Sequence, residues 1–219
     1  MHIVEWAAAH PKSRLVIVGG TFDPIHNGHL ALARIAEEEL NGTICLLPAG
    51  DPPHKDATQA SAAHRLAMTA LAVQETAHAW LVGEDQAADS EPSYTVDILR
   101  ALRHTAPEMD IWMVVGQDAF LEMENWWQPG QLFALACWAV ALRPQDDGVL
   151  GERERVADMA AHYAAHYHAH IRLLQKAGPP VSATMLRTYL EQGLPVDVWL
   201  PGAVAAYIHS HGLYRQRGE

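Results

Sequence analysis

Cysteine is scarce in this sequence, and long apolar runs are missing. Only Cys45 and Cys137 occur in 219 residues, each within an apolar run, which argues against a disulfide framework and favours buried thiols in a reducing compartment. The longest apolar runs, such as residues 132–142 (LFALACWAVAL), are too short to span a bilayer. The first residues lack the basic start and apolar segment of a secretory signal. We therefore expect a cytoplasmic protein that does not associate with membranes.

Positive charge is also scarce. The formal net charge is −11 with histidines neutral, and no stripe of lysine and arginine occurs along the chain. The long-range field of such a protein repels nucleic acid and anionic membranes. We expect no nucleic-acid partner, and any phosphate ligand must be held by local groups.

The residues that are present predict a globular α/β protein. Hydrophobic residues make up 49% and charged residues 19%, as in a soluble enzyme or binding domain. Short β-branched runs alternate with helical periodicity. Strands are expected at 14–18, 43–48, 80–83, 110–115, 135–142 and 171–174, and helices at 27–40, 61–77, 95–104 and 150–168.

This alternation has consequences for the architecture. Strands that alternate with helices form right-handed crossovers, so we expect a doubly wound, mostly parallel sheet with its ligand beyond the carboxyl ends of the strands. We expect a single domain over 14–219 after an N-terminal extension, 1–13, with a helical C-terminal part over about 182–214 that closes on a helix from about 202 to 211. The most loop-like segment is 143–155.

The stretch VIVGGTFDPIHNGHL (16–30) lies between the first strand and the first helix. It contains neither GxxxxGK[ST] nor GxGxxG, the common phosphate-binding motifs. The Asp23-Pro24 pair disfavours helix just before the start of the next one, so His26 and His29 fall on one face of a helix amino terminus, where anions are favoured. Gly28 leaves room for a ligand near the backbone.

Two converging imidazoles suit phosphoryl chemistry, because they can donate hydrogen bonds to oxygens on which charge develops. Two alternatives remain. The glycines could serve only to turn the chain, and the two histidines could be zinc ligands, although no carboxylate or cysteine with suitable spacing supports a zinc site.

The sequence GGTFDPIHNGHL resembles the signature of the nucleotidyltransferases with an HxGH motif. Further stretches resemble the bacterial nicotinate-mononucleotide adenylyltransferases within that superfamily, so the resemblance extends from residue 14 to residue 214. It implies a Rossmann-like nucleotidyltransferase fold and formation of nicotinate adenine dinucleotide in NAD biosynthesis. The stretches are 46–55 (LLPAGDPPHK), 64–68 (HRLAM), 91–99 (EPSYTVDIL), 114–120 (VVGQDAF), 125–127 (NWW), 141–144 (ALRP), 181–187 (VSATMLR) and 207–214 (YIHSHGLY).

The resemblance also implies roles for individual residues. It places the catalytic roles on His26, His29 and Arg187, with Arg187 gripping the triphosphate. The nicotinate nucleotide would meet His54, Lys55, Tyr94, Thr95, Trp126 and Trp127, with Trp126 stacked on the pyridine ring and Thr95 at its carboxylate. The expected ATP contacts are Gly19, Gly20, Thr21, Phe22, His26, Gly28, His29, Gly116, Asp118, Ser182, Thr184 and Arg187.

The chain departs from the family pattern at three places. Ala49-Gly50 stands where the family often has asparagine, so no side-chain contact to the nicotinate carboxylate is expected there. Leu186 replaces the usual isoleucine, and Trp127 stands where tyrosine is common. Adjacent tryptophans usually include one structural member, so we expect one of Trp126 and Trp127 to support the core.

The expected reaction is direct attack by the mononucleotide phosphate on the α-phosphorus of ATP, with Mg²⁺ held by the substrate phosphates and water and by no protein ligand. The alternatives are an enzyme that uses nicotinamide mononucleotide or both mononucleotides, a pantetheine-phosphate adenylyltransferase, and a non-catalytic nucleotide-binding regulator. The sequence also leaves open whether the chain forms a homo-oligomer.

The histidines of HYAAHYHAHI (162–171) match no family motif. His162 and His166 share a helix face and could bind a transition metal together with His168 and His170. The alternative, which we prefer, is a polar alanine-rich helix surface.

Overall fold

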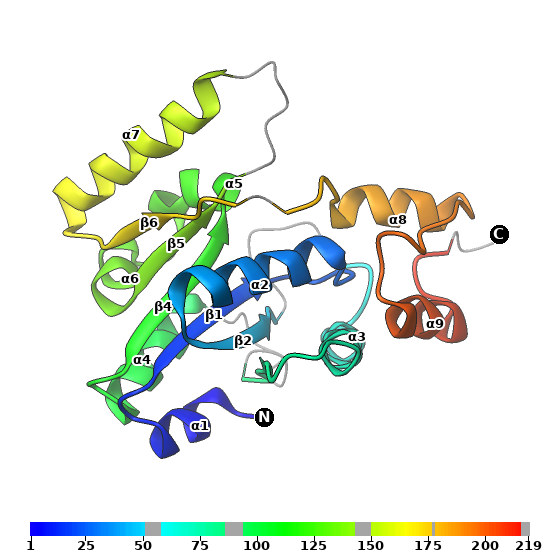
Figure 1. Cartoon of the computed structure of the whole chain (residues 1–219), viewed down its shortest axis with the longest axis horizontal. Coiled ribbons are helices and arrows are strands. Elements are labelled where there is room, and N and C mark those ends of the chain that lie inside the picture. The colour runs from blue at the N-terminus through cyan, green and yellow to red at the C-terminus, as the bar shows by residue number, and fades with distance from the viewer. Residues whose placement is uncertain (51–57, 86–93, 143–149, 177, 216–219) are drawn as a thin grey trace.

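The computed structural model describes residues 1–50, 58–85, 94–142, 150–176 and 178–215. Its six described strands form one sheet in which every neighbouring pair is parallel, in the order β3-β2-β1-β4-β5-β6. Figure 1 shows this sheet crossing the molecule between layers of helices. The strands are β1 (Arg14–Gly20), β2 (Thr43–Pro48), β3 (Leu81–Val82), β4 (Asp110–Gly116), β5 (Cys137–Ala141) and β6 (Ile171–Leu173).

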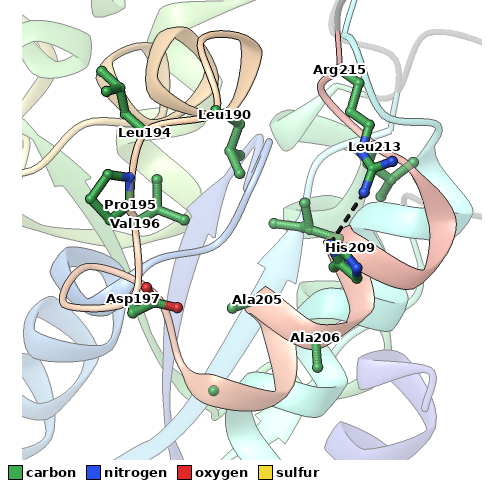
Figure 2. Close-up of a pocket in the computed structure, with 13 residues that line it drawn as sticks. Leu190, Leu194, Pro195, Val196, Asp197, Ala205, Ala206, His209, Leu213 and Arg215 are labelled. Carbon is green, nitrogen blue, oxygen red and sulfur yellow. Dashed lines mark hydrogen bonds between the residues drawn. The ribbon is translucent and has the colours of Figure 1, made fainter.

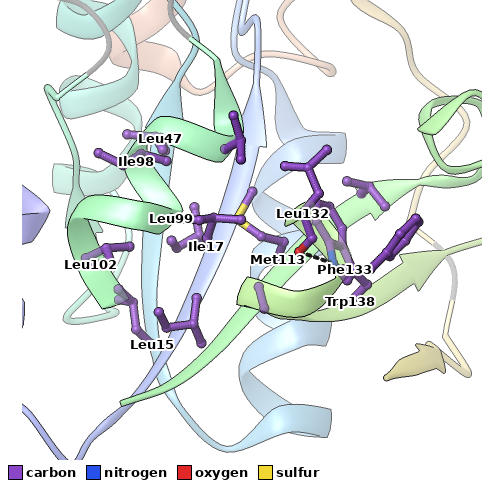
Figure 3. Packing of buried hydrophobic residues seen from close by; sticks show 14 of the residues in the cluster. Leu15, Ile17, Leu47, Ile98, Leu99, Leu102, Met113, Leu132, Phe133 and Trp138 are labelled. Carbon is purple, nitrogen blue, oxygen red and sulfur yellow. Dashed lines mark hydrogen bonds between the residues drawn. The ribbon is translucent and has the colours of Figure 1, made fainter. Parts of the chain in front are cut away.

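Helices cover both faces of the sheet because its strands carry apolar residues on both sides. Leu15 and Ile17 of β1 pack into one core, and Val16 and Val18 pack into the other. The first core (Figure 3) is covered by α1 (Ile3–Ala9), α4 (Thr95–Thr105), α5 (Gln117–Leu121), α6 (Pro129–Leu135) and α7 (Leu150–Tyr167). The second core is covered by α2 (Asn27–Leu40), α3 (Ala62–Gln74), α8 (Ala183–Glu191) and α9 (Gly202–His211).

The predicted α/β doubly wound fold is confirmed, and the sheet is wholly parallel among its described strands. The strand order reverses between β1 and β4, where a doubly wound sheet opens a ligand crevice. The order therefore places the GGTFDPIHNGHL turn, which follows β1, directly at that crevice.

The expected strand at 135–142 begins later than predicted. Residues 129–135 form α6, with Pro129 at its first position, and β5 starts only at Cys137. A proline suits the first turn of a helix because that turn needs no backbone donor. A continuous apolar run has no periodicity that marks such a change, so the boundary could not be located from the sequence.

The residues before β1 form a helix that belongs to the core. Ile3 and Ala7 of α1 are fully buried against the sheet, and the Ile3 N–H donates to the Asp85 carboxylate at 2.8 Å. The predicted division between an extension over 1–13 and a domain over 14–219 stays a prediction. In the structure, α1 lies in the same helical layer as α4.

The C-terminal helices α8 and α9 lie together at one end of the molecule, to the right in Figure 1. Glu75 at the end of α3 accepts hydrogen bonds from the N–H groups of Gly202 and Ala203, at 3.1 and 2.9 Å, which caps the start of α9. The expected closing helix is confirmed over Gly202–His211. No helix among the described residues is long and apolar enough to cross a membrane.

Candidate active site

A cleft of about 790 Å³ opens at the carboxyl ends of β1 and β4. Its size is typical of a site that holds a small organic ligand. Most of the residues predicted from the sequence line it, although they come from widely separated parts of the chain. They are Gly19, Gly20, Thr21, His26, Gly28, His29, Tyr94, Thr95, Gly116, Asp118, Trp126, Trp127, Ser182 and Thr184.

The two histidines stack on one another at the amino terminus of α2, as the spacing predicts. Their ring centroids are 3.6 Å apart and their planes differ by 19°. The backbone N–H of His26 donates to Nδ1 of His29 at 3.3 Å, so a neutral His29 ring carries its hydrogen on Nε2. Nδ1 of His26 is buried and has no hydrogen-bond partner among the described residues. Both histidines line the cleft, so they lie beside the space that a ligand would occupy.

Burial lowers the pKa of His26 to about 4, and this effect outweighs an opposing backbone hydrogen bond. The side chain is only 4% exposed, and desolvation disfavours the charged imidazolium. His26 is therefore neutral near pH 7.

Gly28 brings the segment before α8 against the amino end of α2. A Cβ atom at this position would lie 2.7 Å from Cγ1 of Val181 and 2.9 Å from Nδ1 of His26. The Gly178 backbone also lies close to the Gly28 carbonyl. The glycine thus allows Val181 and the histidine pair to share a space that a side chain would fill.

Phe22 and Arg187, two of the predicted ligand contacts, do not line the cleft. Phe22 is 1% exposed, and its ring lies under Gly20 and meets the His29 ring edge-on at 4.9 Å. Phe22 has a positive φ of 51° and packs into the core on the α2 side of the sheet, where it supports the loop after β1.

Arg187 holds the loop after β1 from the side of α8. Its Nη1 donates to the Asp23 carbonyl at 2.9 Å, and its Nη2 donates to Oγ1 of Thr184 at 3.3 Å. Thr184 and Ser182 are at the start of α8, where Oγ of Ser182 caps the helix by accepting from the Met185 N–H at 3.2 Å. The predicted contact of Arg187 with the triphosphate stays a prediction.

The opposite wall of the cleft is aromatic. Trp126 packs edge-on against buried Trp138, with centroids 6.3 Å apart, whereas Trp127 is 55% exposed and faces Tyr94 at 6.0 Å. Trp126 is thus the member of the pair that supports the core, and it also lines the cleft. Tyr94 and Thr95 begin α4 directly beside it. His54 and Lys55 lie outside the described residues.

Two buried polar side chains near the cleft had no role in the prediction. Gln117 lines the cleft, is 5% exposed and donates through Nε2 to the Glu152 carboxylate of α7 at 2.8 Å. Arg65 is fully buried beside the loops that follow β1 and β2. Both lie in stretches that resemble the family, but sequence patterns alone give a buried polar residue no role.

The described residues include no group of three or more histidine, cysteine, aspartate or glutamate side chains that could hold a metal ion. His162 instead contacts the Glu124 carboxylate at 2.8 Å, and its ring lies 4.4 Å from that of His166. His168 and His170 are exposed. This arrangement favours the interpretation of the segment as a polar helix surface.

A second hollow of about 570 Å³ lies between the end of α8 and α9, away from the predicted site (Figure 2). Leu190, Leu194 and Leu213 give it an apolar wall, and Arg215 donates to Nδ1 of His209 at one end. None of the residues predicted for the site lines it.

The fold and the cleft define a class of nucleotide-transferring proteins. The family model described as cytidylyltransferase-like matches residues 17–189 of the chain. The chain is 38% identical over 215 residues to the probable nicotinate-nucleotide adenylyltransferase of Stenotrophomonas maltophilia (strain K279a), a match that covers 91% of this chain and 96% of the relative. It is 39% identical over 212 residues to the protein of the same name from Laribacter hongkongensis (strain HLHK9), with 94% and 96% covered.

Within that class, the chain belongs to the family of nicotinate-nucleotide adenylyltransferases. Among solved structures, it is similar to Plasmodium falciparum nicotinic acid mononucleotide adenylyltransferase complexed with NaAD, with a TM-score of 0.70. That likeness covers 92% of this chain and 97% of the other at 18% identity, and it supports the fold.

Proposed function

We propose that the chain transfers the adenylyl group of ATP to nicotinate mononucleotide, giving nicotinate adenine dinucleotide and pyrophosphate. The observation that carries this proposal is the stacked His26–His29 pair at the amino end of α2, inside a cleft whose other wall is aromatic. The pair suits phosphate, and the wall of Tyr94, Trp126 and Trp127 suits a flat pyridine ring. The curated relatives share this activity in their names.

In this mechanism, an oxygen of the mononucleotide phosphate attacks the α-phosphorus of ATP, and the bond from that phosphorus to the bridging oxygen of pyrophosphate breaks. No protein nucleophile is needed, so the chain contributes positioning and charge stabilisation. Nε2 of His29 carries a hydrogen that can be donated to a phosphoryl oxygen. The N–H groups at the start of α2 and α8 add further donors.

ATP would enter as its magnesium complex. Because the described residues include no group of three metal-ligating side chains, we propose that phosphate oxygens and water hold the ion. Magnesium bound in this way offsets charge on the phosphates.

The proposed substrate can be tested by measuring pyrophosphate release from magnesium ATP with nicotinate mononucleotide and, in parallel, nicotinamide mononucleotide. We expect at least a tenfold higher kcat/KM for the acid, a difference of about 1.4 kcal/mol, because the N–H groups at the start of α4 favour a carboxylate. Equal use of the two would reassign the chain to a dual-specificity enzyme. Release with neither substrate would reject the proposal.

A second prediction concerns His26 and acid stability. The folded protein holds this residue with a pKa of about 4, whereas an unfolded histidine titrates near 6.5. Below pH 6.5 the unfolded chain therefore takes up a proton that the folded protein does not, and the free energy of unfolding falls until about pH 4. The slope from this residue is at most about 1.4 kcal/mol per pH unit.

Urea unfolding of the wild type and of His26→Asn between pH 4 and pH 8 measures this effect. We expect the variant to lose less stability than the wild type as the pH falls from 6.5 to 4, since the other titrating groups are common to both proteins. Parallel stability curves over that range would show that His26 titrates normally in the folded state.

A cytoplasmic location also belongs to the proposal. It is supported by Cys45 and Cys137, which carry free thiols; burial raises the pKa of the Cys45 thiol to about 12. We propose small nucleotides as the ligands, with no nucleic acid or membrane partner, because the formal net charge is −11.

A further inference from the structure

Arg65 is in the first turns of α3, and its side chain is completely buried. Its guanidinium donates to backbone carbonyls of separate segments. Nη1 donates to Thr21 at 2.8 Å and to Ala49 at 2.5 Å, Nη2 donates to Gly50 at 2.7 Å, and Nε donates to Ala60 at 3.3 Å. One side chain thus joins the loop after β1, the loop after β2 and the approach to α3.

The carbonyls of Thr21, Ala49 and Gly50 follow the last paired residues of β1 and β2, so they lie beyond the hydrogen-bonded part of the sheet. The register of β1 and β2 ends at Gly20 and Pro48, and one further bond runs from the Ala49 N–H to the Gly20 carbonyl at 2.8 Å. Beyond Gly20 and Ala49, no strand pairing joins the two loops among the described residues. Arg65 supplies donors to the carbonyls that follow, because a planar guanidinium offers N–H groups in several fixed directions.

Both loops border the cleft. Thr21 belongs to the turn that carries His26 and His29, and Ala49, whose N–H donates to the Gly20 carbonyl, lies beside that turn in the lining of the cleft. In-line transfer needs the attacking oxygen, the α-phosphorus and the leaving oxygen to be aligned, and small displacements of the groups that hold them reduce the rate steeply.

We propose that Arg65 is a positioning residue for the transfer step: it fixes the distance between the loop after β1 and the loop after β2, and so aligns the two substrates. The inference rests on the proposed adenylyl transfer. Arg65 is fully buried and does not line the cleft, so it acts through the carbonyls of Thr21, Ala49 and Gly50.

The chain offers a matched control at the opposite ends of the strands from the cleft. Arg103, in the last turn of α4, donates to the carbonyls of Leu135 at 2.7 Å, Met109 at 2.6 Å and Pro107 at 3.3 Å. Met109 precedes β4 and Leu135 comes just before β5, so these bonds lie at the amino ends of the strands. Arg103 therefore braces backbone as Arg65 does, but away from the cleft.

The test compares Arg65→Lys with Arg103→Lys in the pyrophosphate-release assay and in thermal unfolding. A lysine keeps the positive charge but cannot reach carbonyls in several directions at once. We expect both variants to melt at a lower temperature than the wild type. Only Arg65→Lys should lose kcat, by roughly 10- to 100-fold, with the KM for each substrate changed by less than about threefold.

Chemical rescue supplies a readout that a purely structural role would not produce. In Arg65→Ala, free guanidinium at millimolar concentration should enter the space left by the side chain and raise kcat, whereas urea at the same concentration should not. If Arg65→Ala fails to fold, Arg65→Lys decides the question. Wild-type kcat in Arg65→Lys, or an equal loss of kcat in Arg103→Lys, would overturn the proposal. An inactive wild type would reject the proposed adenylyl transfer itself, so the two failures are distinguishable.

Discussion

Replacing His29 by alanine should leave a folded protein whose kcat is lower by roughly 10²- to 10³-fold. Nδ1 of His29 accepts from the His26 N–H, so the hydrogen on Nε2 is the donor that the ring can offer to a phosphoryl oxygen. This donor matters most in the transition state, when charge develops on the oxygens around the α-phosphorus. The loss should therefore appear in kcat more than in the KM for ATP.

A second variant separates catalysis from local structure. In His29→Asn, the amide oxygen can still accept the hydrogen bond from the His26 N–H at the start of α2. The variant lacks Nε2, the atom that carries the donated hydrogen. We expect it to be as inactive as His29→Ala. The exposed His104 at the end of α4 provides the control, and His104→Ala should turn over normally. Near-normal turnover in either His29 variant would contradict the catalytic assignment.

Replacing Asp23 by alanine should lower the free energy of unfolding by roughly 3–5 kcal/mol. The carboxylate is 4% exposed and accepts hydrogen bonds from the N–H groups of Gln59 at 2.9 Å and Ala60 at 3.1 Å. It also accepts from the hydroxyl of Tyr214 at 2.6 Å. Its removal leaves the buried donors of Ala60 and Tyr214 without this acceptor, which costs more than the net value of the hydrogen bonds themselves.

Urea unfolding near pH 7 measures the effect. Tyr214→Phe is the matched variant, because it removes one donor and leaves the carboxylate with its two N–H partners; we expect it to lose roughly 1–2 kcal/mol. Burial, together with the hydrogen bond to Asp23, raises the pKa of Tyr214, so the phenol stays protonated at neutral pH. A loss below about 1 kcal/mol in Asp23→Ala would show that the loop after β1 finds other partners.

Local patterns in the sequence account for much of the architecture and for the centre of the site. The alternation of short β-branched runs and amphipathic segments predicted the parallel sheet, and the spacing of His26 and His29 predicted their shared face. These features depend on residues close together in the chain. Their geometry is therefore set by the periodicity of a strand or of a helix.

Features that depend on distant residues could not be predicted in this way. The apolar segment around 132–142 divides into α6 and β5, and no local period marks the boundary, because Phe133 and Trp138 are both buried in a core built from distant elements. The same holds for Arg65, whose partners follow two strands, and for Arg187, which donates to the carbonyl of Asp23. Each of these contacts arises only when the sheet has brought its loops together.

The hydrogen bond between Asp23 and Tyr214 joins residues 191 positions apart. The ribosome makes the chain from its amino end. The turn that carries the two histidines therefore leaves the exit tunnel long before Tyr214 has been translated. Until residue 214 has emerged, this buried carboxylate lacks one of its donors, and the loop after β1 lacks the stability that this hydrogen bond adds. The loop that carries the histidine pair therefore gains its full set of hydrogen bonds only near the end of synthesis, after the strands that form the sheet have already been made.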